Sequence, residues 1–194
     1  MKMKRSIFAI LGISSLFLTS VAHAHILPGD VHGFGSGFSH PWHGLDHMLA
    51  MIGVGLWAAQ LGGSARWRVP ASFVGVMAVG GALAMAGLRL PFVEQGIVAS
   101  VMAVGLLIAL AARMPVSASM AVVGVFAMFH GLSHGAEMPV NALGFAYGAG
   151  FVLATTILHA GGIGVAYAVR SVRLPVIRWA GAGIAMAGLV LRLM

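Results

Sequence analysis

The sequence contains no cysteine, and only 8% of its 194 residues are charged. Without cysteine there can be no disulfide bonds, thiolate zinc sites, iron–sulfur clusters or thiol catalysis. The low charge and the apolar content of 60% exclude an ordinary soluble domain, because such domains carry about 25% charged residues. No nucleotide-binding motif is present, so we expect no ATP-driven work by this chain alone. The composition predicts an integral membrane protein.

Basic residues outnumber acidic ones by 11 to 4, which gives a net charge of +7. They lie at the ends of apolar runs, a pattern that indicates membrane orientation rather than nucleic-acid binding. What the chain does have, among so few polar side chains, is nine histidines. Ionisable groups inside a bilayer are costly and usually functional, so the histidines are the feature that a function must explain.

The N-terminus has the pattern of a secretory signal peptide. Three basic residues precede an apolar stretch over Ile7–Leu18, and Ala22-His23-Ala24 has the small-x-small form of a cleavage site. We therefore predict a signal peptide over residues 1–24 and a single transmembrane domain over residues 25–194. An uncleaved signal anchor, adding one helix, is the alternative. After cleavage, residues 25–39 are expected to form a short exposed arm outside the cytoplasm.

Six further apolar segments are long enough, or nearly so, for a hydrocarbon layer of about 30 Å. Backbone groups in lipid must be satisfied within each segment, so all six are predicted to be helices. The expected fold is an all-α integral membrane protein, a compact six-helix transmembrane bundle. The predicted segments are Trp42–Leu61, Val69–Leu88, Phe92–Ala112, Val116–His134, Val140–Val169 and Pro175–Leu193.

The distribution of arginine predicts which side of the membrane each loop occupies. With the mature N-terminus outside, the external side carries only Arg89 and Arg192. The cytoplasmic side follows the positive-inside rule. Its arginines are Arg66, Arg68, Arg113, Arg170, Arg173 and Arg178.

Most polar side chains fall in the external half of two predicted helices. On the first helix, with Pro41 at its start, His43, Asp46 and His47 stand at i, i+3 and i+4 and share one face. His40 lies two turns above His47, on nearly the same face. The fourth helix carries a second polar stripe at i, i+4 and i+7. Its members are His130, His134 and Glu137.

The two stripes match in depth, because each spans seven residues, or about 10 Å of helix. Imidazole with carboxylate, and without thiolate, suits borderline divalent ions such as Ni, Co, Zn or Fe. Neutral imidazole is the ligating form, so binding should weaken in acid. The many methionines are better explained as core or lipid-facing residues than as soft ligands. The pattern predicts a metal site in the outer half of the membrane.

Four other residues extend this prediction. Glu94, at the external start of the third helix, either joins the entrance or faces the headgroups. His159 lies deeper in the fifth helix, where it is a candidate inner relay or a structural hydrogen-bond partner between helices. His25 and His32 lie in the predicted external arm and form a candidate capture arm for the ion.

These residues carry a resemblance to a known family. The sequence contains His40-Pro41-x-x-Gly44-x-Asp46-His47 followed by Ala50-Met51, Glu94 with Ser100, Phe129-His130-Gly131-x-x-His134-Gly135-x-Glu137, and Ala154-Thr155-x-x-Leu158-His159. It resembles the HupE/UreJ family of bacterial membrane proteins over nearly the whole chain. That resemblance implies a secondary nickel permease, sometimes of cobalt, associated with hydrogenase or urease maturation. It implies roles for the matching residues, whereas His43 falls at a variable position and rests on helix geometry alone.

The sequence and the resemblance together predict a permease that carries Ni2+, or Co2+, from the periplasm across the bacterial inner membrane. We expect no enzymatic activity, no prosthetic group and no nucleic-acid partner; the partners are the ion and the lipid bilayer. Two alternatives stay open, a membrane metalloenzyme and a metal-binding accessory protein that does not transport. The driving force, the oligomeric state and any contact with a metallochaperone are not given by the sequence.

Overall fold

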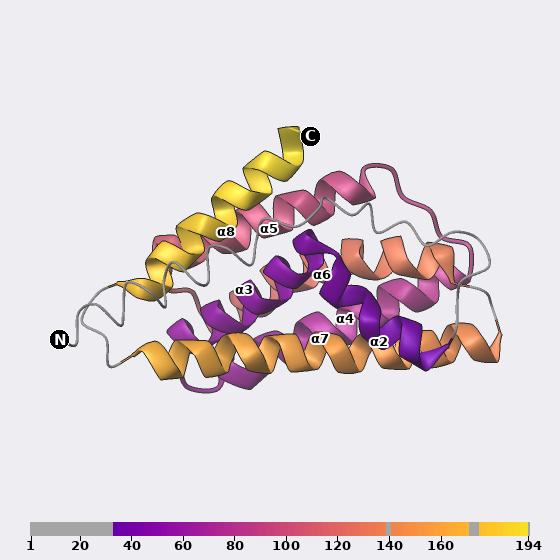
Figure 1. Cartoon of the computed structure of the whole chain (residues 1–194), viewed down its shortest axis with the longest axis horizontal. Coiled ribbons are helices and arrows are strands. Elements are labelled where there is room, and N and C mark those ends of the chain that lie inside the picture. Colours follow the sequence, from indigo (N-terminus) through magenta and orange to yellow (C-terminus); the bar gives the residue numbers. More distant parts are fainter. Residues whose placement is uncertain (1–32, 139–140, 171–174, 194) are drawn as a thin grey trace.

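The computed structural model describes residues 33–138, 141–170 and 175–193. In these ranges every regular element is a helix (Figure 1), which confirms the predicted all-α class. The predicted signal peptide lies outside the described residues. The helices are α2 (Phe34–His43), α3 (Leu45–Leu61), α4 (Ala65–Met85), α5 (Val93–Ala109), α6 (Val116–Glu137), α7 (Ala142–Val169) and α8 (Val176–Leu193).

Four of these helices are long and apolar enough to cross a membrane. They are α4, α8 and most of α6 and α7, and they match four of the six predicted spans. Helices α3 and α5 are also apolar but have only 17 residues each. A helix of that length rises about 25 Å, which is close to the lower limit for a span.

The first predicted span, Trp42–Leu61, is wrong as a single helix. The backbone is extended at Gly44 (φ −87°, ψ 110°), so α2 ends at His43 and α3 begins after the break. Glycine loses more conformational entropy in a helix than other residues do, and the Asp46 carboxylate stabilises the start of α3 through the helix dipole. Pro41, predicted to open the helix, lies inside α2.

The prediction of an exposed arm over residues 25–39 is wrong from Phe34 onwards, where α2 begins. Helix α2 packs against α7. The ring of His40 has its centroid 6.0 Å from that of Tyr147 and 5.8 Å from that of Phe151. Burial of this aromatic face favours an ordered helix over an exposed arm.

The remaining helices pack mainly as pairs, α4 with α6, α5 with α8, and α3 with α7 (Figure 1). All three pairs bring backbones together at glycine, as two of them illustrate. A Cβ on Gly131 of α6 would lie 2.2 Å from the carbonyl oxygen of Met77 on α4. A Cβ on Gly55 of α3 would lie 2.2 Å from the carbonyl oxygen of His159, and Gly162 of α7 approaches α3 equally closely. Small residues permit such approach where lipid provides no hydrophobic drive for association.

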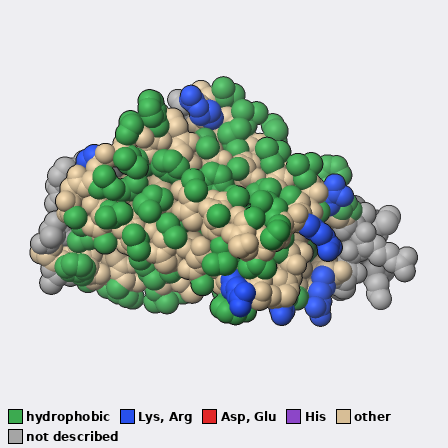
Figure 2. All heavy atoms as spheres, turned by 180° about the vertical axis from the view of Figure 1, so that it is seen from behind, with side chains coloured by type: hydrophobic (Ala, Val, Ile, Leu, Met, Phe, Trp, Pro, Cys, Tyr) green, Lys and Arg blue, Asp and Glu red, His purple; other side chains and the backbone are tan. Residues whose placement is uncertain are grey.

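The outer surface of the bundle is apolar. Figure 2 shows hydrophobic side chains across one face, with Lys and Arg gathered mainly toward one end. The exposed large apolar side chains include Trp67, Phe92, Leu110, Phe145 and Trp179. Large apolar patches on this scale are typical of a surface that contacts lipid.

The described arginines lie in two groups, one at each end of the bundle. Arg66 donates a 2.7 Å hydrogen bond to the hydroxyl of Tyr167, and Arg170 stacks over the same ring. Arg89, beyond the opposite end of α4, donates to the carbonyl oxygens of Ala84 and Ala136. Arginines predicted to be cytoplasmic and an arginine predicted to be external therefore lie at opposite ends.

Candidate metal centre

The start of α3 fixes the imidazole of His47. The Asp46 carboxylate oxygen Oδ1 accepts hydrogen bonds from both the backbone N–H and Nδ1 of His47, each at 2.8 Å. A carboxylate can only accept, so Nδ1 of His47 carries a proton, and in the neutral imidazole, which is the form that ligates a metal, Nε2 keeps its lone pair. Asp46 is half-buried and His47 is buried. This pairing orients the histidine in the way that carboxylates orient metal-ligating imidazoles.

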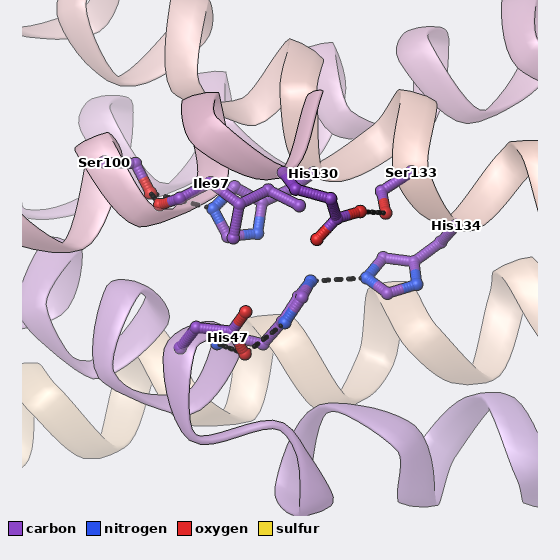
Figure 3. Close-up of polar contacts among 8 residues, drawn as sticks. His47, Ile97, Ser100, His130, Ser133 and His134 are labelled. Carbon is purple, nitrogen blue, oxygen red and sulfur yellow. Dashed lines mark hydrogen bonds and ion pairs between the residues drawn. The ribbon is translucent and has the colours of Figure 1, made fainter. Parts of the chain in front are cut away.

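Helix α6 brings His134 to the same point. Its Nε2 atom faces Nε2 of His47 in a hydrogen bond (Figure 3). Because Nε2 of His47 carries no proton, Nε2 of His134 is the donor. The other ring nitrogen of His134, Nδ1, is buried and has no hydrogen-bond partner. Two imidazoles from separate helices thus converge inside the protein.

His40, from α2, completes the outer part of this group. Its ring centroid lies 4.6 Å from that of His134 and 6.2 Å from that of His47. Its Nε2 atom is buried without a partner. The break at Gly44 makes this possible, because α2 need not continue along the axis of α3. His40 can therefore lie close to His134 and His47.

His130 lies on the inner side of the group, one helical turn before His134. Its ring centroid is 4.9 Å from that of His47. Ser100 donates its only hydroxyl proton to the Ile97 carbonyl, at 2.6 Å, so its oxygen accepts from Nε2 of His130 at 3.0 Å (Figure 3). Nδ1 of His130 therefore keeps its lone pair, buried and without a partner. We call His40, His47, His130 and His134 the outer imidazole cluster, after the side of the membrane on which the sequence predicts them.

Other predicted site residues lie apart from this cluster. His43 is exposed, and its Nδ1 donates to the Ser39 carbonyl at 2.8 Å. The shared face predicted for it with His47 is wrong, because the helix does not continue through Gly44. His25 and His32 fall outside the described residues, as does the side chain of Glu137, although its backbone ends α6.

Glu94 is hydrogen-bonded to α6 next to His134 in the sequence. Its Oε1 atom accepts a 3.0 Å hydrogen bond from the hydroxyl of Ser133, the residue before His134. The carboxylate is held in the first turn of α5, on the exposed side of the bundle. Its place at an entrance stays a prediction.

His159 is buried and stands inward of the outer imidazole cluster. Its Nδ1 donates to the Met51 carbonyl at 2.7 Å, so α7 is hydrogen-bonded to α3. Its Nε2 keeps a lone pair and has no partner. His159 therefore links two helices, as its structural alternative predicts. Its second ring nitrogen remains free to bind a ligand.

Within the described ranges, no three His, Asp or Glu side chains are arranged to hold a metal ion at once. In this conformation the imidazoles are hydrogen-bonded to one another and to Asp46 and Ser100. Four unpaired nitrogens remain in the described part of the chain, on His40, His130, His134 and His159. Buried polar atoms are seldom left without a partner, so their presence here calls for an explanation.

Comparison with known proteins identifies the family. The sequence matches the family described as "HupE / UreJ protein" over residues 13–191. The chain belongs to the HupE/UreJ family. It is 45% identical to Protein HupE of Rhizobium leguminosarum bv. viciae over 186 residues, which is 92% of this chain and 94% of that protein. No solved structure matches the chain.

Family membership confirms the resemblance carried by the motifs, and with the apolar helices it makes the chain a multi-pass membrane protein. Several residues of this HupE/UreJ member contact the candidate site although no chemical role is predicted for them from the sequence. Ser100 fixes the ring of His130, and the Met51 carbonyl holds His159. Ser100 offered a signal, as a hydroxyl buried within an apolar helix. The aromatic side chains beside the cluster, Tyr147 and Phe151, offered none, because the local sequence does not show which residues on other helices an aromatic ring contacts.

Proposed function

We propose that this protein carries a divalent transition-metal ion, Ni2+ or Co2+, from the periplasm to the cytoplasm. The observation that carries the proposal is the outer imidazole cluster, four buried imidazoles from three helices in an apolar bundle. Membership of the HupE/UreJ family supports nickel as the substrate, and hydrogenase or urease maturation as the process supplied. The same membership supports a transporter rather than an enzyme.

The chemistry of the cluster suits such an ion. Imidazole nitrogen binds borderline metals, and the chain contains no thiolate that would favour softer ions. A divalent ion in a medium of low dielectric constant needs anions nearby. Asp46 supplies one through its contact with His47, and Glu94, bonded to Ser133, is proposed as another. Glu137 is proposed as a third on sequence grounds, and His25 and His32 as an external capture arm.

The proposed route runs inward from His40 and His134, past His47 and His130, to His159. An ion bound by Nε2 of His47 breaks the hydrogen bond from His134, and Nε2 of His134 can join as a ligand once its proton has moved to the unpaired Nδ1 of the same ring. His159 then serves as the inner relay, through the nitrogen that Met51 does not hold. Each station offers few ligands at a time, which allows release as well as binding.

The proposed orientation follows from the signal peptide over residues 1–24 and from the arginines. Cleavage would leave residues 25–194 as one transmembrane domain in the bacterial inner membrane, with its N-terminus in the periplasm. The inside-negative membrane potential then favours cation entry, by about 2.3 kcal/mol per charge for each 100 mV.

Uptake of radiolabelled nickel by a nickel-depleted bacterial strain tests the function. Cells expressing the chain should accumulate nickel faster than cells with an empty vector, and His47→Ala and His134→Ala should each lower the rate by at least about tenfold. His43→Ala is the matched control, because His43 is exposed and bonded to Ser39; it should transport normally.

Equal uptake by His47→Ala and the unsubstituted chain, at equal amounts in the membrane, would contradict the proposed site. Uptake no faster than that of the empty vector, with nickel still bound by the purified protein, would favour the accessory-protein alternative. Competition by cobalt, zinc and iron in the same assay measures selectivity.

A further inference from the structure

One buried aromatic ring contacts both the outer imidazole cluster and His159. Phe73 of α4 is only 1% exposed. Its ring centroid lies 5.5 Å from that of His130 and 5.1 Å from that of His159, with the latter pair edge to face. A single side chain from a fourth helix thus contacts the last outer imidazole and the inner one.

The two histidines beside this ring have the same hydrogen-bonding pattern. His130 is held at Nε2 by Ser100, and His159 is held at Nδ1 by the Met51 carbonyl. In each ring the other nitrogen is buried and unpaired. Leaving a buried nitrogen without a partner costs about 1–3 kcal/mol. A ligand that binds to both nitrogens would explain why the protein tolerates this cost. Phe73 offers neither nitrogen a polar partner.

The apolar barrier extends along α4 in both directions. Val69, Phe73 and Met77 stand at successive turns of the helix, and all three are buried. On the side of Met77, the Thr155 hydroxyl lies 3.9 Å from the Met77 sulfur, which is a weak acceptor. A constriction lined by apolar groups excludes water and with it a hydrated cation.

We propose that Phe73 closes the cation path between the outer imidazole cluster and His159, and that its ring must move aside before an ion can pass. This inference rests on the proposed function, because it presumes that ions travel from His130 to His159. On this proposal, the movement of the Phe73 ring limits the entry of the ion, although a phenylalanine side chain cannot bind a metal. An ion held by His130 waits on the outer side of the ring until the ring moves.

The natural absence of cysteine makes the barrier directly measurable. Val69→Cys introduces one thiol one turn inward of Phe73, at a buried position. Spheroplasts carrying this variant are treated from outside with a small, membrane-impermeant cationic thiol reagent. With Phe73 in place the thiol should react slowly, and in the Phe73→Ala background the rate should rise by about tenfold or more, because the apolar constriction is removed.

Two further variants make the result specific. Phe73→Leu retains most of the packing and should give a smaller rise; it also carries the test if Phe73→Ala does not insert. Ile108→Ala removes a fully buried side chain that packs against Gly181 of α8, away from the proposed path, and should leave labelling unchanged.

Equal labelling with Phe73 and with alanine at that position would overturn the barrier, as would an equal rise caused by Ile108→Ala. Labelling requires no nickel transport, so it separates this inference from the proposed function. Nickel uptake measured on the same variants shows independently whether the chain is a permease.

Discussion

Replacing Gly131 by alanine tests how closely α4 and α6 must approach. The new Cβ would lie 2.2 Å from the carbonyl oxygen of Met77 and 2.8 Å from the backbone nitrogen of Gly81. Both are backbone atoms, so neither can rotate away. Carbon and oxygen in contact are at least about 3.3 Å apart, so the two helices must separate by about 1 Å. Overpacking of this kind costs about 1–3 kcal/mol.

Gly148→Ala, in α7, is the matched control, because a Cβ there meets nothing within 4 Å. Both substitutions place alanine inside a helix, so the gain in helix propensity is the same and cancels. We therefore expect Gly131→Ala to be less stable than Gly148→Ala by about 1–3 kcal/mol. Unfolding of the two purified variants, followed in the same detergent, gives this difference. Equal stability would refute the argument that backbone contact sets the spacing of α4 and α6.

Three further outcomes are expected. Asp46→Asn keeps an oxygen beside His47 but removes the charge, so nickel affinity measured by calorimetry should fall by about tenfold or more; unchanged affinity would remove Asp46 from the site. Ser100→Ala should weaken nickel binding through His130 while Ser100→Thr restores it, and similar losses in both would indicate packing alone. Asn141→Ala removes the side-chain cap of α7 and should cost about 1 kcal/mol of stability, whereas Asn141→Asp should not.

The second polar stripe could be predicted because α6 is one continuous helix. Spacings of i and i+4 place His130 and His134 on the same face in any regular helix, and the structure keeps α6 regular through both. Their match in depth with His47 also needed only a constant rise per residue and the order of the spans. These are properties that local sequence determines.

The first helix could not be predicted in the same way. Pro41 favours a helix start by its own geometry, and no local rule distinguishes that start from the break at Gly44. The outcome depends on packing between α2 and α7, where His40 meets Phe151 across a long separation in sequence. Phe73 was missed for a similar reason, because a phenylalanine in an apolar helix reveals its neighbours only once α4, α6 and α7 are assembled.

The glycines where α3 meets α7 determine which motions can carry His159. At Gly55 and Gly162 the two backbones are already in contact, so a closing hinge between these helices has no room. An opening hinge would break the hydrogen bond from His159 to the Met51 carbonyl and leave buried polar groups unpaired. A sliding of α7 along α3 would move His159 off the same carbonyl. The glycine contacts and this hydrogen bond therefore make α3 and α7 move as one body, which keeps the imidazole of His159 at a constant depth relative to His47 on α3.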